Sequence, residues 1–213
     1  RMDRLTILVF ALVYVGMIFG KYPGLAMDRT GMALLGAIVL IVAGRVGEQE
    51  AWQAIDVPTI VLLLGLMVVS SQLRLGGFYT EVTRRIAAAD VSPRTLLALV
   101  IASMSALSAV LTNDVICLAV TPVLIEGCAR RKLNPVPYLL ALACAANIGS
   151  AATLIGNPQN MLIGQALNLS FAGYLLDAII PSVIGLGVVW IVIVAHARGR
   201  WHLETPLPEY DAP

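Results

Sequence analysis

The chain has 213 residues, of which 59% are hydrophobic and only 13% are charged, and its formal net charge is +1. A water-soluble domain carries about 25% charged residues, so this composition excludes an ordinary soluble protein and indicates a chain made for the lipid bilayer. The nearly neutral charge gives no reason to expect a nucleic-acid partner. The sequence contains neither an HExxH zinc motif nor a GxSxG nucleophile motif, so it does not predict an enzyme or a bound cofactor.

Six apolar runs follow one another along the chain, and a helix needs about 20 residues to cross a bilayer core. The first, third and last runs are predicted to be ordinary spans, and the first is predicted to be retained rather than cleaved as a signal peptide. The second is short for a span unless it begins near residue 26. The runs are residues 5–20, 31–44, 58–73, 96–129, 138–169 and 174–197.

Residues 77–89, between the third and fourth runs, have a different pattern. Arg84 and Arg85 fall on one side of a helix, and Phe78, Val82 and Ile86 fall on another. This pattern predicts an amphipathic helix that lies in the membrane interface.

The fourth run is too long for one span, and Leu111-Thr112-Asn113-Asp114 interrupts it near its centre. Positive residues mark the cytoplasmic side of a membrane, and they flank this run at both ends. Each arm, with about 16 residues, rises about 24 Å. We therefore predict a re-entrant helical hairpin with both ends in the cytoplasm and its tip near the bilayer middle. The flanking residues are Arg84, Arg85, Arg94, Arg130, Arg131 and Lys132.

The fifth run is interrupted as well, by glycine, proline and amide residues at 147–160. Proline suits the first position of a helix and asparagine suits the cap before it. One half-helix is therefore predicted to end near Gly149, and another to start at Pro158 with Asn157 as its cap. Irregular backbone at membrane depth is tolerated only where it is buried in protein or lines a cavity.

The two interruptions together form the predicted substrate and ion site. Half-helix N-termini attract anions, and hydroxyl, amide and carbonyl oxygens suit Na⁺, for which Asn113, Asp114 and Asn157 are the candidate ligands. The backbone N–H groups of residues 114–116 and 159–160 are candidates for an anion. The alternative is that these residues only cap broken helices. The candidate site residues are Thr112, Asn113, Asp114, Ser150, Thr153, Gly156, Asn157, Pro158, Gln159 and Asn160.

Asp114 is the acid expected nearest the bilayer centre, which makes it a functional candidate; as an alternative it caps the second arm of the hairpin. The three cysteines, Cys117, Cys128 and Cys144, are expected to be buried apolar residues, with a thiolate site for a metalloid as the alternative. Serines at 103, 105 and 108 are expected to permit close helix packing.

Residues 26–31, 55–79, 111–114 and 147–161 resemble the citrate/arsenite-permease branch of the ion transporter superfamily. The resemblance implies two inverted repeats, each with a hairpin and an unwound helix, in a protein that forms homodimers. It also implies that the hairpin tip binds sodium and carboxylate, although Asp114 replaces the threonine found at the tip in dicarboxylate symporters. Only one hairpin and one unwound helix are present here, so the likeness is to the N-terminal repeat.

The prediction is therefore an all-α polytopic membrane protein that forms one repeat unit. Residues 1–90 would form scaffold-like spans and the interfacial helix, 91–169 the transport unit, 170–200 the last span, and 201–213 a polar linker to a second half. The predicted function is the first half of a secondary transporter in the inner cell membrane that moves a small anion with Na⁺ or H⁺. Its partners would be membrane lipid, the second repeat and a second copy. The alternatives are arsenite or antimonite efflux, Na⁺/H⁺ antiport, and a structural subunit that does not transport.

Overall fold

The computed structural model describes residues 3–19, 28–197 and 199–202. These residues form ten helices and no strand, apart from one isolated bridge between Leu133 and His202. Most of the linker predicted at 201–213, and the start of the motif at 26–31, lie outside the described residues. The helices are α1 (Arg4–Phe19), α2 (Arg29–Val42), α3 (Glu48–Gln53), α4 (Val57–Leu75), α5 (Phe78–Ala88), α6 (Pro93–Val110), α7 (Asn113–Arg130), α8 (Pro135–Ala151), α9 (Pro158–Ala166) and α10 (Phe171–Ala197).

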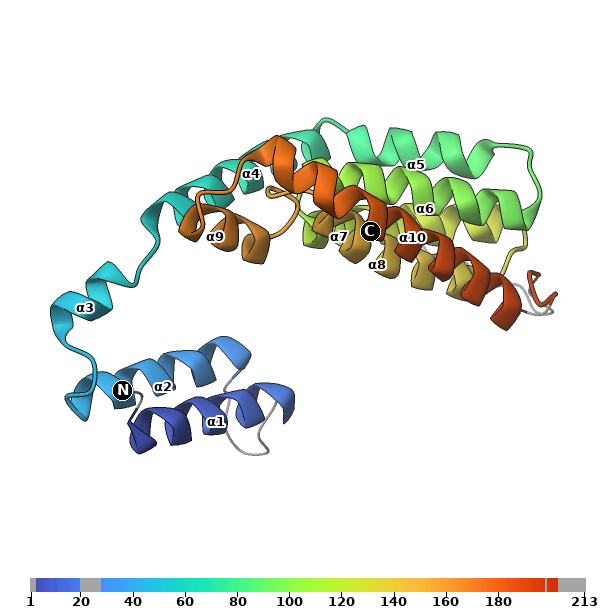
Figure 1. The fold of residues 1–213 in the computed structure, drawn as a ribbon. Helices are drawn as coiled ribbons and strands as arrows, with labels where there is room; N and C mark the ends of the chain where they lie inside the picture. The colour runs from blue at the N-terminus through green and yellow to red at the C-terminus, as the bar shows by residue number, and fades with distance from the viewer. Residues whose placement is uncertain (1–2, 20–27, 198, 203–213) are drawn as a thin grey trace. The chain divides into compact units, whose positions relative to one another are not determined.

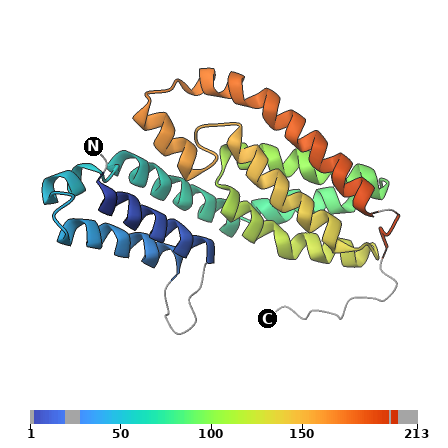
Figure 2. The ribbon, with the colours of Figure 1, turned by 60° about the horizontal axis from the view of Figure 1, so that its bottom comes forward.

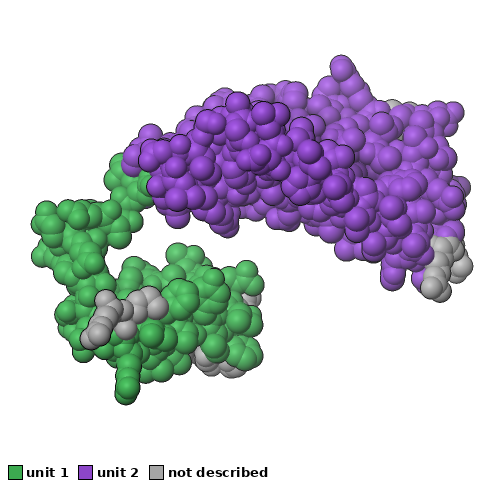
Figure 3. Space-filling model, viewed as in Figure 1, with its two compact units in different colours: residues 1–57 green, residues 58–213 purple. Residues whose placement is uncertain are grey.

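The chain divides into two compact units, Arg1–Val57 and Pro58–Pro213 (Figure 3). In the first unit α1 packs along α2, where Gly36 leaves room for Val13. The Asp28 carboxylate accepts a 2.8 Å hydrogen bond from the Gly31 N–H and so caps α2. Many large apolar side chains of both helices are exposed, as expected for helices that face lipid.

The second unit is built around α6 and α8, which lie side by side (Figures 1 and 2). Helices α7 and α10 pack against α8, and α5 packs against α7. The apolar core between them includes Leu97, Met104, Ile116, Tyr138 and Leu142. Many large apolar side chains of α4 and α10 are exposed, so these two helices offer an apolar surface to the bilayer.

Three helical stretches are long and apolar enough to cross a membrane, namely Glu48–Leu75, Pro93–Val110 and Phe171–Ala197. The first and third of these confirm the spans predicted for the third and last apolar runs. Helix α1 has 16 residues and rises about 24 Å, so as described it is shorter than the span predicted there. The sequence-based prediction of an all-α multi-pass membrane protein is confirmed, and the division into scaffold and transport segments at residue 90 stays a prediction.

Helix α5 forms where the amphipathic pattern predicts it. It follows Gly77, whose φ of 74° is left-handed and favours glycine. Tyr79 and Thr83 are buried on one side of α5, whereas Arg84 and Arg85 are exposed on the other. The position of α5 in the membrane interface stays a prediction.

Helices α6 and α7 form a hairpin. The guanidinium group of Arg131, just after α7, donates to the carbonyl oxygens of Ala89 (2.9 Å) and Val91 (2.8 Å), just before α6. The Tyr138 hydroxyl of α8 donates to the Pro93 carbonyl (3.1 Å), so α8 starts at the same end. We call this end, defined by Arg84, Arg94, Arg130 and Arg131, the arginine end.

The arms of the hairpin are longer than expected. Each has 18 residues and rises about 27 Å, close to the thickness of a bilayer core. The common location of the two outer ends agrees with the prediction that the chain returns to the side from which it started. The depth of the tip, and therefore re-entrance, stays a prediction.

Candidate functional site

The tip of the hairpin is a two-residue connection, residues 111–112. Thr112 is the N-cap of α7, yet its hydroxyl caps nothing. The residue is only 7% exposed, and its Oγ1 has no hydrogen-bond partner among the described residues. A buried hydroxyl without a partner is costly, and this one lies at the N-terminus of a helix.

Asp114 is not the cap of α7, contrary to the alternative raised from the sequence. The cap position belongs to Thr112, and Asp114 lies in the first turn of the helix, where a carboxylate interacts favourably with the helix dipole. Its side chain is exposed. Within the described part of the chain, no hydrogen bond or ion pair holds the carboxylate, so it is free to meet a proton or a cation.

The break between α8 and α9 closely matches its prediction. Helix α8 ends at Ala151, α9 begins at Pro158, and the Asn157 side chain caps α9 by accepting a 2.8 Å hydrogen bond from the Asn160 N–H. The Asn160 amide in turn donates to the Thr153 carbonyl (2.8 Å). Local capping chemistry therefore ends one helix and starts the next.

The tip and the break lie together, although they are about 40 residues apart. The Thr153 hydroxyl, in the break, donates to the carbonyl oxygen of Ala109 in the last turn of α6. The amide of Asn113 donates to Asn147 Oδ1 of α8 (3.2 Å). These contacts place Thr112, Asn113 and Asp114 beside the last turn of α8.

Two glycines let backbones approach closely at this place. A Cβ atom added to Gly149 would lie 2.5 Å from Ser105 Cα of α6, and one added to Gly156 would lie 2.7 Å from Ser150 Cα. Both distances are far inside the usual carbon–carbon contact of about 3.5–4.0 Å. The Ser108 hydroxyl also donates to the Ala146 carbonyl (2.6 Å), so the predicted packing role is confirmed for Ser105 and Ser108.

Several predicted oxygen ligands are already occupied. Ser150 Oγ accepts from the Asn157 amide (3.3 Å), Thr153 Oγ1 accepts from the Gly156 N–H (3.1 Å), and Asn157 Oδ1 accepts from the Asn160 N–H as the α9 cap. The Asn160 N–H, predicted to face an anion, is taken by the same cap. These bonds stabilise the break, and the binding roles of the candidate residues stay predictions.

The groups left at the site belong mainly to the hairpin tip: Thr112 Oγ1, Asn113 Oδ1 and the Asp114 carboxylate. Gln159, in the first turn of α9, is exposed, and Gly156 and Pro158 shape the backbone there. The described residues contain no group of three or more His, Cys, Asp or Glu able to hold a metal ion. The set that remains is one of hard oxygens, which suits Na⁺ or a proton rather than a transition metal.

Asn147 lies at the site, although it is not among the site residues predicted from the sequence. Its side chain is exposed, accepts from Asn113 and donates to the Ala143 carbonyl (2.9 Å). A lone amide in an apolar run was the signal that could have identified it. Cys144, one helical turn away, is exposed, so the expectation that all three cysteines are buried is wrong for this residue. No other described helix of the second unit covers this face of α8.

Comparison with known proteins identifies the family. Residues 14–206 match the family model described as citrate transporter. The chain belongs to the citrate transporter family. It is 36% identical over 185 residues to the silicon efflux transporter LSI3 of Oryza sativa subsp. japonica, an alignment that covers 87% of this chain and 38% of the relative.

Two other proteins are similar over most of the chain. The putative transporter arsB of Dictyostelium discoideum is 30% identical over 82% of this chain and 31% of its own length. A 46 kDa membrane protein of Mycobacterium leprae is 34% identical over 79% of this chain and 41% of its own length. The chain thus spans less than half the length of these relatives, and the names of the Oryza and Dictyostelium proteins point to transport.

Proposed function

We propose that this chain is the N-terminal half of a secondary active transporter of the inner cell membrane, which moves a small anion together with Na⁺ or H⁺. The observation that carries the proposal is the meeting of the hairpin tip with the break between α8 and α9. At that meeting point Asp114 is exposed and the Thr112 hydroxyl is buried without a partner. Two costly interruptions of helices in apolar surroundings favour a binding site.

The hairpin tip offers one feature that favours an anion and another that favours a cation. The first N–H groups of α7 have no partner within the helix and carry the positive end of its dipole, which favours an anion. The negative charge of Asp114 opposes that anion unless a proton or Na⁺ neutralises it. Binding of the coupling ion at Asp114 would therefore permit binding of the anion, which is the requirement for coupled transport.

The other half of the site belongs to the part of the transporter that this chain does not include. Asp114 and Asn147 are exposed, and a polar group left facing lipid costs several kcal/mol. A second repeat that covers this face would complete the cavity, and the partial coverage of the relatives supports its existence. The complete protein would then act as a homodimer, as expected for such permeases.

A second candidate function is the efflux of an uncharged metalloid compound. It is favoured by the name of one relative, the silicon efflux transporter LSI3. The negative charge of Asp114 would also not repel an uncharged solute, whereas it would repel an anion. Na⁺/H⁺ antiport would use the same carboxylate without any second substrate.

The experiment that tests the proposal is transport by the complete protein in proteoliposomes. Labelled citrate, arsenite and silicic acid would be offered under an imposed pH or Na⁺ gradient, with the present 213-residue chain as the incomplete control. We expect gradient-driven movement of one substrate class by the complete protein only. If only Na⁺ or H⁺ moves, the antiporter replaces the anion permease; if nothing moves under any gradient, the proposal is wrong.

A further inference from the structure

A surface cavity lies between α5 and α7 at the arginine end, well away from the hairpin tip. Its volume is about 430 Å³, within the range of about 300–1,000 Å³ typical of small-molecule sites. Its walls carry three arginines against two carboxylates, so positive charge is in excess. The charged residues are Arg84, Arg130 and Arg131, together with Asp90 and Glu126.

Two of these arginines form ion pairs on the surface with residues of their own helices, and they have no other ion pair among the described residues. Arg84 pairs with Glu81, and Arg130 pairs with Glu126 at 2.6 Å, and the side chains of Arg84 and Arg130 are 71% and 76% exposed. Exposed pairs of this kind contribute about 0–1 kcal/mol. Both guanidinium groups can therefore turn toward an anion at little cost.

The third arginine gives the cavity a fixed positive charge. Arg131 is anchored by its hydrogen bonds to the carbonyl oxygens of Ala89 and Val91, which lie in the connection between α5 and α6. An anion seated here would therefore contact the end of the hairpin's second arm and the segment that leads into its first arm.

The surface beside the cavity is apolar. Leu118 and Pro122 of α7 are exposed, Leu118 to 70%, and residues four apart lie on the same side of a helix. The same side of α7 continues through Glu126 to Arg130, so it changes from apolar to charged toward the arginine end. A phospholipid with an anionic headgroup has a matching arrangement, because its charged headgroup is followed by an apolar acyl chain.

We propose that this cavity binds the phosphate headgroup of an anionic phospholipid, with an acyl chain lying along Leu118 and Pro122. Clusters of arginine at the cytoplasmic face meet a leaflet rich in anionic lipid, which places the ligand where the cavity is. Bound lipid would connect α5 to the hairpin and stabilise the arrangement of the two.

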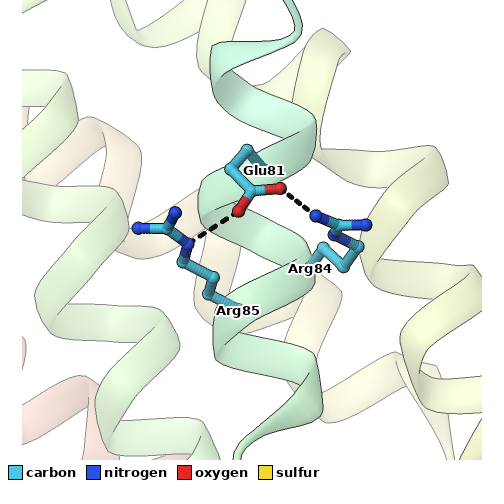
Figure 4. Close-up of polar contacts among 3 residues, drawn as sticks. All are labelled: Glu81, Arg84 and Arg85. Carbon is cyan, nitrogen blue, oxygen red and sulfur yellow. Dashed lines mark hydrogen bonds and ion pairs between the residues drawn. The ribbon is translucent and has the colours of Figure 1, made fainter.

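Helix α5 supplies a matched pair of variants for the test. Figure 4 shows Glu81 between Arg84 and Arg85, each of which donates to one of its carboxylate oxygens. Arg84 lines the cavity, whereas Arg85 is not among its lining residues. Substitution by glutamine removes one positive charge in either case and leaves Glu81 one arginine partner.

The experiment titrates the delipidated complete protein in detergent with phosphatidylglycerol, with phosphatidylcholine or with inorganic phosphate, and measures the rise in melting temperature. Because each arginine near a membrane surface contributes about 1 kcal/mol to anionic-lipid binding, Arg84→Gln should weaken phosphatidylglycerol binding about fivefold. Arg84→Gln with Arg130→Gln should weaken it about 25-fold, and Arg85→Gln should leave it unchanged.

Three outcomes would overturn the proposal. If Arg84→Gln and Arg85→Gln weakened phosphatidylglycerol binding equally, the binding would depend on diffuse surface charge and not on the cavity. Equal stabilisation by phosphatidylcholine would remove the role of the anionic headgroup. A matching effect of inorganic phosphate at the same concentration would assign the cavity to a soluble anion instead of a lipid. Each variant is compared with its own lipid-free melting temperature, so a change in intrinsic stability does not alter the result.

Discussion

Replacing Gly149 by alanine tests whether the close approach of α6 and α8 builds the site. The added Cβ would lie 2.5 Å from Ser105 Cα, so the two helices would have to separate by about 1 Å to reach normal contact. Overpacking costs about 1–3 kcal/mol, and the upper end applies because a backbone cannot change rotamer. Alanine is more favourable than glycine within a helix by about 0.5–1 kcal/mol, which offsets part of this cost. The free energy of unfolding should therefore fall by about 2 kcal/mol.

The assay is reversible unfolding of the complete protein in mixed micelles, followed by circular dichroism. Gly187→Ala in α10 is the matched control, because a Cβ there would meet nothing within 4 Å, and we expect it to be neutral or slightly stabilising. Gly149→Ala should also lower transport, since it displaces the tip from the break. Equal unfolding curves for the two variants would refute the account of this contact.

Two other predictions concern the hairpin. Thr112→Val removes a buried hydroxyl without a partner, so the free energy of unfolding should rise by about 1 kcal/mol while transport falls at least tenfold. The control is Thr153→Val, which leaves the Gly156 N–H without its acceptor and should therefore lower the free energy of unfolding. A Thr112→Val variant that transports normally would remove this hydroxyl from the site. Cysteines introduced at Arg94 and Arg130 should react with an impermeant reagent from the same side of the membrane, and reaction from opposite sides would contradict the hairpin.

Features fixed by local chemistry were predictable from the sequence. The Asn157-Pro158 cap, the end of α8 near Gly149 and the presence of a helix at α5 depend on residues close together in the chain, and the structure confirms them. The apolar side predicted for α5 is confirmed only in part, because Phe78 is exposed. The apolar runs indicated a membrane protein for the same reason, since bilayer insertion depends on consecutive residues.

Features fixed by tertiary contacts were not predictable. The position of Thr153 in the sequence could not reveal that its hydroxyl already donates to the carbonyl oxygen of Ala109, which lies 44 residues away in the chain. The position of the α7 cap at Thr112 rather than Asp114 depends on the path of the chain at the tip. The contact between Asn113 and Asn147 joins two elements whose register no local pattern encodes.

The most direct test of the central claim is gradient-driven uptake by the complete protein carrying Asp114→Asn. Asparagine keeps the size of the side chain and removes its charge, so the protein should fold while the coupling ion loses its partner. Asp177→Asn, at an exposed acid of α10, is the matched control. We predict that Asp114→Asn loses concentrative uptake but keeps substrate counterflow, and that Asp177→Asn behaves as wild type. Concentrative uptake by Asp114→Asn at the wild-type rate would contradict the assignment of coupling to the hairpin tip.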